Sequence, residues 1–134
     1  MNKVTPFLMF QRAQAEAAIH LYTSLFDEAE VLAISRYGPG EPGVEGSVRQ
    51  AAFALHGQTI LCIDSNIEHD FDFTPSFSFF VNCEDEAELE RLWAALSQDG
   101  EVRMPLDNYG FSQKFGWVSD RFGVSWQLNL PAQG

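Results

Sequence analysis

Residues 116–127 read GWVSDRFGVSWQ, and this stretch decides the fold. Its centre, residues 119–123, has the polar residues and the glycine that are typical of a tight turn. Apolar residues alternate with small or polar ones on both sides of the centre, as they do in strands that bury one face. The stretch therefore predicts a strand over 113–119, a turn, and a final strand over 124–130.

An earlier stretch has the same layout, which indicates an internal repeat. Residues 55–61, LHGQTIL, also place a turn glycine before a strand, and PFLMF at 6–10 matches SFSFF at 76–80. Each half of the chain then reads as a strand, a helix and three strands. The predicted strands are 4–10, 31–37, 48–55, 59–64, 76–81, 101–106, 113–119 and 124–130, and the predicted helices are 14–26 and a segment from 82–85 to Gly100.

These elements predict an α+β fold in a single domain, residues 1–134. The first βαβββ module covers 4–64, a linker covers 65–75, and the second module covers 76–131. Neither module is long enough to be stable alone. We therefore expect the two modules to pair into one curved mixed sheet around a concave cavity.

The composition excludes several classes of protein. With 46% hydrophobic residues in a chain of 134, the protein buries a core and is not disordered. Its formal charge of −11 repels phosphate backbones and anionic lipids, so we expect no nucleic-acid or membrane partner. No apolar stretch approaches the roughly 18–20 residues of a membrane span, and the first residues lack the layout of a secretory signal. Cys62 and Cys83 read as reduced core residues, which predicts a cytoplasmic protein.

Strand alternation predicts a neutral cavity on the face of the sheet that points away from the helices. Its lining of aromatic, aliphatic, amide and hydroxyl groups suits a small, weakly polar organic ligand, with Gln127 as the main hydrogen-bonding group. The predicted ligand-binding residues are Phe7, Met9, Gln50, Leu61, Ser76, Ser78, Phe80, Trp117 and Gln127. The alternative is that the polar members of this set meet only solvent or a partner subunit.

The histidines and cysteines give weaker candidates. His20 and His56 read as surface residues, whereas His69 lies in the acidic linker DSNIEHDFD, residues 64–72, whose carboxylates could bind a hard cation. This linker lacks the spacing of a calcium loop, so the other interpretations are a solvated segment or a lid over the cavity. Cys83 lies at a helix start, which lowers a thiol pKa, but next to acidic residues, which raise it. No histidine lies on the predicted concave face, so no Ser–His–Asp triad is predicted.

The chain resembles the vicinal-oxygen-chelate superfamily, which includes glyoxalases, bleomycin-resistance proteins and extradiol dioxygenases, and within it the PhnB-like branch. The matching residues are TPFLMF at 5–10, HLYTSLF at 20–26, SFSF at 76–79 and, most specifically, GWVSDRFGVSWQ at 116–127. Together they cover nearly the whole chain. The resemblance implies paired βαβββ modules and a homodimer, because a partner subunit commonly completes or buttresses the cavities of this family.

The same resemblance implies where a metal would lie: Thr5, Leu61, Ser76 and Gln127 occupy the superfamily's ligand positions. A divalent metal prefers three or four His, carboxylate or thiolate donors, and of these four residues only Gln127 is even a weak candidate. We therefore predict no cofactor and disfavour a divalent metal. Members of the branch often carry a ubiquinone-pathway methyltransferase label, but the glycines of residues 38–43 are interrupted by two prolines and form no nucleoside-binding loop.

These observations predict a small-molecule-binding protein with a metal-free cavity. One alternative is a metal-dependent lyase, isomerase or dioxygenase of the superfamily type. The other is a structural or interaction protein without a ligand. The residues alone do not decide between a binding protein and an enzyme, and they do not name the ligand.

Overall fold

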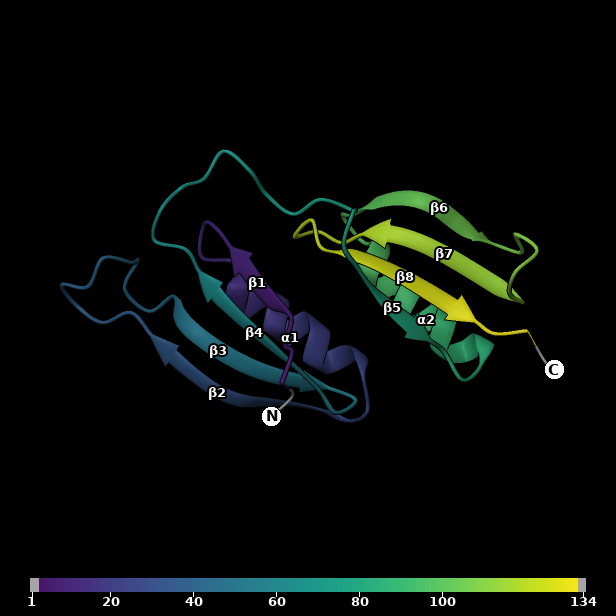
Figure 1. The fold of residues 1–134 in the computed structure, drawn as a ribbon, viewed down its shortest axis with the longest axis horizontal. Coiled ribbons are helices and arrows are strands. Elements are labelled where there is room, and N and C mark those ends of the chain that lie inside the picture. The colour runs from purple at the N-terminus through teal and green to yellow at the C-terminus, as the bar shows by residue number, and fades with distance from the viewer. Residues whose placement is uncertain (1–2, 133–134) are drawn as a thin grey trace. The chain divides into compact units, whose positions relative to one another are not determined.

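The computed structural model describes residues 3–132, which form two compact units divided after Phe71 (Figure 1). Each unit is a βαβββ module, so the predicted α+β class and the two-module organisation are confirmed. The first module contains β1 (Phe7–Phe10), α1 (Ala15–Leu25), β2 (Ala29–Arg36), β3 (Val48–Leu55) and β4 (Gln58–Asp64). The second contains β5 (Ser78–Asn82), α2 (Glu86–Ser97), β6 (Glu101–Asp107), β7 (Lys114–Ser119) and β8 (Ser125–Leu130).

The first module is a four-stranded mixed sheet with α1 packed on one face (Figure 1). Its strand order is β1-β4-β3-β2, with β1 parallel to β4 and the other neighbours antiparallel. Apolar residues recur along α1 at the helical period, and Tyr22 of this stripe lies 6.2 Å from Phe53 of β3, between ring centroids. Phe53 therefore marks the face of the sheet that α1 covers, and its neighbours along β3 point to the opposite face.

The second module repeats this layout with the order β5-β8-β7-β6 and with α2 on one face. The Asp85 side chain caps α2 by accepting a hydrogen bond from the backbone N–H of Glu88 at 2.8 Å. The helix stops before Gly100, where an added Cβ would lie 2.4 Å from the carbonyl oxygen of Ser119. Glycine is therefore required at this point because the backbone passes so close to β7.

Two turns behave as the sequence predicts. His56 and Gly57 both have positive φ, 50° and 82°, and they join β3 to β4 as a two-residue antiparallel hairpin. In the turn before β8, the buried Asp120 carboxylate accepts hydrogen bonds from the backbone N–H groups of Phe122 and Val124 at 2.8 and 3.1 Å. It also accepts one from the indole N–H of Trp126 at 2.9 Å. Asp120 therefore has a structural role.

Three expectations need correction. The strand expected at 76–81 begins at Ser78, because Ser76 lies in a turn where its hydroxyl contacts that of Thr74 at 2.7 Å. The first strand begins at Phe7, so Thr5 precedes it. Hydrogen bonding also groups the described strands into two four-stranded sheets, in place of the single sheet that we expected.

The helices of the described residues are short. α1 has 11 residues and α2 has 12. Over residues 3–132, no helix is both long and apolar enough to cross a membrane.

Candidate functional site

The sheet of the second module has one face that α2 covers and one that it does not. Gly116 identifies the covered face, because a Cβ built there would lie 2.6 Å from the ring of Trp93 on α2. Side chains alternate along a strand, so Trp117 points to the other side, which we call the open face of the second module. Cross-strand pairing assigns to this face Ser78, Phe80, Asn82, Glu101, Met104, Asp107, Phe115, Trp117, Ser119, Ser125, Gln127 and Asn129.

The centre of the open face is a row of side chains in direct cross-strand register. Gln127 of β8 lies between Phe80 of β5 and Trp117 of β7, and Met104 of β6 continues the row beyond Trp117. Neighbouring strands lie about 4.8 Å apart, so the amide of Gln127 has an aromatic ring on each side. Phe80 is 55% exposed and Gln127 is half-buried. Within residues 3–132 the Gln127 side chain makes no hydrogen bond, so its donor and acceptor are available to a ligand.

A set of hydroxyl groups fixes the indole of Trp117. Its Nε1–H donates to the Ser125 hydroxyl at 2.8 Å, and that hydroxyl contacts the hydroxyl of Ser78 at 2.6 Å. Ser125 is buried, so these bonds are shielded from water. These bonds hold Trp117, one of the predicted ligand-binding residues, in a single orientation on the open face.

An aromatic cluster extends the open face beyond the predicted residues. The ring of Phe115 lies 6.4 Å from Phe80 and 5.0 Å from Phe111, and Phe111 stacks on Tyr109 at 6.3 Å. Phe111 is 62% exposed. The loop beside it borders a hollow of about 400 Å³, lined by Asn108, Gly110, Phe111, Ser112, Gln113 and Ala132. Strand alternation missed this cluster because the loop lies outside the strands, although two aromatic residues flanking Gly110 were a visible signal.

The first module has its own open face, on the side of the sheet opposite Phe53 and α1. Phe7 of β1 lies directly opposite Leu61 of β4, and Met9 lies opposite Ile63. Gln50 is on β3, opposite Ser35 of the edge strand. This face is mainly apolar.

The nine predicted ligand-binding residues thus fall into three groups. Ser78, Phe80, Trp117 and Gln127 share the open face of the second module. A second group lies on the first module and comprises Phe7, Met9, Gln50 and Leu61. Ser76 belongs to neither strand surface because it lies in the turn before β5. The role of each group in binding stays a prediction.

The positions that would hold the superfamily's metal do not fit a divalent ion. Leu61 has no donor atom, the Ser76 hydroxyl contacts Thr74, and Gln127 offers only a neutral amide. Over the described part of the chain, no three His, Cys, Asp or Glu side chains are grouped so that they could hold a metal ion. The donor chemistry therefore gives a metal little to bind.

The acidic linker is anchored by a buried glutamine. The Gln11 side chain, 3% exposed, accepts from the backbone N–H of His69 at 2.7 Å and donates to the carbonyl of Phe71 at 2.8 Å. The Ser65 hydroxyl contacts the carbonyl oxygen of Ile67 at 2.9 Å and His69 Nε2 at 3.1 Å. These bonds hold the linker against itself.

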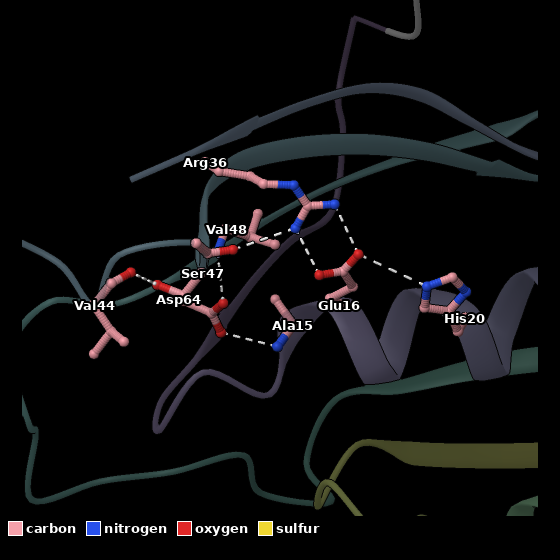
Figure 2. A network of polar contacts seen from close by, with 9 residues as sticks. Ala15, Glu16, His20, Arg36, Val44, Ser47, Val48 and Asp64 are labelled. Atoms are coloured by element: carbon pink, nitrogen blue, oxygen red, sulfur yellow. Dashed lines mark hydrogen bonds and ion pairs between the residues drawn. The ribbon is translucent and has the colours of Figure 1, made fainter. Parts of the chain in front are cut away.

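Asp64 is the first residue of the acidic linker, and both of its carboxylate oxygens accept hydrogen bonds from backbone N–H groups (Figure 2). Its Oδ1 accepts from the N–H of Ala15 at 2.8 Å and its Oδ2 from the N–H of Val48 at 2.9 Å. Nearby, Arg36 forms a bidentate ion pair with Glu16, at 2.6 and 2.7 Å (Figure 2). The hydrogen bond from Arg36 holds the pKa of Glu16 below its usual value. These carboxylates hold elements together, and the sequence pattern alone did not show this.

The two thiols are not nucleophiles at neutral pH. Burial raises the pKa of Cys62 to about 12, with Asp64 adding to the effect. Burial also raises the pKa of Cys83 to about 12, and Glu88 contributes in the same direction. At Cys83 the desolvation and the acidic neighbours outweigh the helix start that would lower the pKa.

Comparison with known proteins finds a matching family model and several solved structures with the same fold. The family model described as 3-demethylubiquinone-9 3-methyltransferase matches residues 2–129. The solved PhnB protein of Bacillus cereus is 52% identical, with 96% of this chain and 99% of that one covered and a TM-score of 0.94. A Pseudomonas aeruginosa protein is 25% identical over 99% of this chain and 100% of its own, with a TM-score of 0.85. The fosfomycin resistance protein FosX of Listeria monocytogenes, 12% identical over 98% and 94% with a TM-score of 0.61, shares the fold alone. Among curated proteins no match is found.

Proposed function

Because this chain belongs to the PhnB-like family of the vicinal-oxygen-chelate superfamily, we propose that it binds a small organic molecule on the open face of its second module. The observation that carries the proposal is the row of Phe80, Gln127 and Trp117. The Gln127 amide, which has no hydrogen bond within residues 3–132, lies between two aromatic rings. It offers directional hydrogen bonds within an apolar surface, as sites for weakly polar ligands do. The ligand is therefore a flat, partly apolar molecule with a hydrogen-bonding group that reaches Gln127.

Methyl transfer, which the description of the family model names, is not part of this proposal. A nucleoside cofactor is commonly held by a glycine-rich turn between a strand and the following helix. Here the two strand-to-helix segments, 11–14 and 83–85, contain no glycine. Arg12 and Ala13 instead adopt positive φ with their side chains in place. These segments do not fit such a cofactor.

The proposal also requires no metal. Leu61, at one of the four positions that would ligate a metal in the superfamily, has no donor atom, and Gln127 is more useful as a hydrogen-bonding group than as a weak ligand. The homodimer that the family resemblance implies stays a prediction beside this proposal.

The test uses Gln127→Ala and an uncharged bicyclic aromatic amide, 2-naphthamide, as the reference probe in a screen of similar neutral compounds. Losing one neutral hydrogen bond costs about 1 kcal/mol, so we expect binding to weaken about fivefold in isothermal titration calorimetry. The midpoint of thermal unfolding should stay unchanged, because the Gln127 side chain has no hydrogen bond within residues 3–132.

The matched control is Gln98→Ala, which removes the same group from the exposed end of α2. It should leave both the affinity and the stability as they are in the wild type. The proposal fails if no neutral aromatic probe binds, or if Gln127→Ala binds every detected probe as tightly as the unsubstituted protein does.

A further inference from the structure

Over the part of the second module that the structure describes, the open face has a cation, Arg103, at its β6 edge. The strand β6 is irregular on both sides of Met104, with shifts in its pairing to β7 between Val102 and Met104 and again before Asp107. The Nε–H of Arg103 donates to the hydroxyl of Ser119 at 2.9 Å. Ser119 lies on the open face, two residues from Trp117, so this bond places the guanidinium there as well.

The guanidinium of Arg103 is held in place by one hydrogen bond, and several of its other N–H donors have no hydrogen-bond partner within residues 3–132. Ser119, its partner, is only 5% exposed, so the hydrogen bond is anchored in a buried side chain. Nη2 contacts Glu101 at a long 3.5 Å, and within residues 3–132 Nη1 has no hydrogen bond. Arginine has five N–H donors and stays charged at all relevant pH values. Most of these donors are therefore free, and the Arg103 side chain is 30% exposed.

The surrounding charges do not neutralise this group. Glu101 is the carboxylate that contacts it, and the Glu101 side chain is 72% exposed, so water screens the pair. Asp107 lies on the same strand, opposite Phe115 and beyond Met104. Glu101 and Asp107 pair with Ser119 and Phe115, so both carboxylates lie at the same β6 edge as Arg103. In a protein with a net charge of −11, a fixed cation beside the aromatic, hydroxyl and amide groups at the centre of this face is a specific feature.

The spacing sets the size of the molecule that would reach both polar groups. Arg103 lies on β6 and Gln127 on β8, with β7 between them. Two strand spacings amount to about 10 Å. A fused two-ring system with one substituent at each end spans about this distance while its ring plane contacts Trp117, which lies between them.

We propose that Arg103 is a specificity-determining residue that binds a carboxylate of the ligand, so that the natural ligand is an aromatic or similarly flat organic acid. This inference rests on the proposed function, since it adds a charged group to the same ligand. The planar guanidinium presents parallel N–H donors that match the two oxygens of a carboxylate. The Ser119 hydroxyl keeps that fork in place before the ligand arrives.

The experiment compares two probes of equal size, 6-carbamoyl-2-naphthoate and naphthalene-2,6-dicarboxamide, by isothermal titration calorimetry at pH 7. Both carry an amide that can reach Gln127, and they differ only in whether a carboxylate or a second amide stands at the Arg103 end. We expect the wild-type protein to bind the carboxylate about tenfold more tightly than the diamide, because charge-assisted hydrogen bonds are about twice as strong as neutral ones. Arg103→Gln should abolish this preference by weakening the binding of the carboxylate probe to that of the diamide. Arg103→Lys should keep part of the preference, because it retains the charge without the planar fork.

The control variant is Arg121→Gln, which removes one positive charge from the turn where Arg121 donates to the carbonyl of Ala95 on α2. It should preserve the tenfold preference. If 6-carbamoyl-2-naphthoate binds no more tightly than naphthalene-2,6-dicarboxamide, or if Arg103→Gln keeps the preference, the inference is wrong and the proposed function stands. If neither probe binds, both are wrong.

Discussion

At the scale of single residues, burial determines the chemistry of the two thiols. Cys62 and Cys83 are 0% and 3% exposed, and the pKa of each is raised from 9.0 to about 12. A shift of about three pH units lowers the thiolate fraction at neutral pH about a thousandfold. Since the thiolate is the reactive form, both cysteines act as small apolar core residues.

We predict that alkylation by iodoacetamide at pH 7.5 is about a thousandfold slower in the folded protein than in urea, measured by mass spectrometry. The free energy of unfolding should also depend on pH in one direction. The pKa of each thiol is higher in the folded protein than in the unfolded one. The stabilisation that the protonated thiols give is therefore complete at pH values below the unfolded pKa of 9.0, and it is lost as the pH rises towards 12.

This loss is isolated by comparing urea unfolding of the wild type with that of the double variant Cys62→Ala and Cys83→Ala between pH 8 and 11. The wild type should lose stability more steeply over this range, because other titrating groups contribute equally to both proteins. Parallel curves, or rapid alkylation of the folded protein, would contradict the prediction.

At the scale of elements, Asp64 ties three segments of the first module together (Figure 2). It ends β4, and its buried carboxylate accepts from the first residue of α1, Ala15, and from the first residue of β3, Val48. The hydroxyl of Tyr37 donates to the carbonyl oxygen of the same residue at 3.1 Å. One side chain therefore fixes where a helix and a strand begin relative to the end of another strand.

We predict that Asp64→Asn lowers the free energy of unfolding by about 2 kcal/mol in urea titrations. An amide has one acceptor oxygen, so its NH₂ group would face one of the two backbone N–H donors and leave that donor without a partner. Asp70→Asn is the control, because Asp70 is an exposed residue of the linker. Equal stability of Asp64→Asn and Asp70→Asn would refute the structural role.

At the scale of the whole molecule, the proposed binding protein and the alternative metalloenzyme differ in whether the chain needs a bound metal. The positions that ligate metal in the superfamily hold threonine, leucine, serine and glutamine here. We predict well below one equivalent of metal per chain in elemental analysis of untagged protein purified without chelator. We also expect EDTA to leave the affinity for 2-naphthamide unchanged. Near-stoichiometric nickel, zinc, manganese or iron would favour the metal-dependent lyase, isomerase or dioxygenase instead.

Much of the fold could be read from local patterns, because helical and strand periodicity report directly on which side chains are buried. The apolar stripe through Tyr22 predicts α1, and His56-Gly57 predicts the hairpin between β3 and β4. Errors arose at strand ends. Ser76 continues the alternation of its strand in the sequence, yet it lies in a turn, because pairing with β8 begins only at Ser78.

The candidate site was partly predictable for the same reason. Alternation placed Phe80 and Gln127 on one face, and cross-strand pairing confirms that they are neighbours. It did not reveal Arg103, because the irregular pairing of β6 breaks the simple alternation that the prediction uses. Nor did it reveal Phe111, which reaches the site from a loop.

The sequence by itself thus determined the repeat of two βαβββ modules, the covered and open faces of most strands, and the aromatic, amide and hydroxyl groups at the centre of the second module's open face. These properties follow from each residue's own polarity and from the period of the local backbone. Only the tertiary structure decided which residues meet. It set the register of Phe80, Gln127 and Trp117 and the hydrogen bond from Arg103 to Ser119. It also set the hydrogen bonds that the Asp64 carboxylate accepts from the starts of α1 and β3. These contacts join residues far apart in the chain, and their geometry depends on strand pairing that no local pattern encodes.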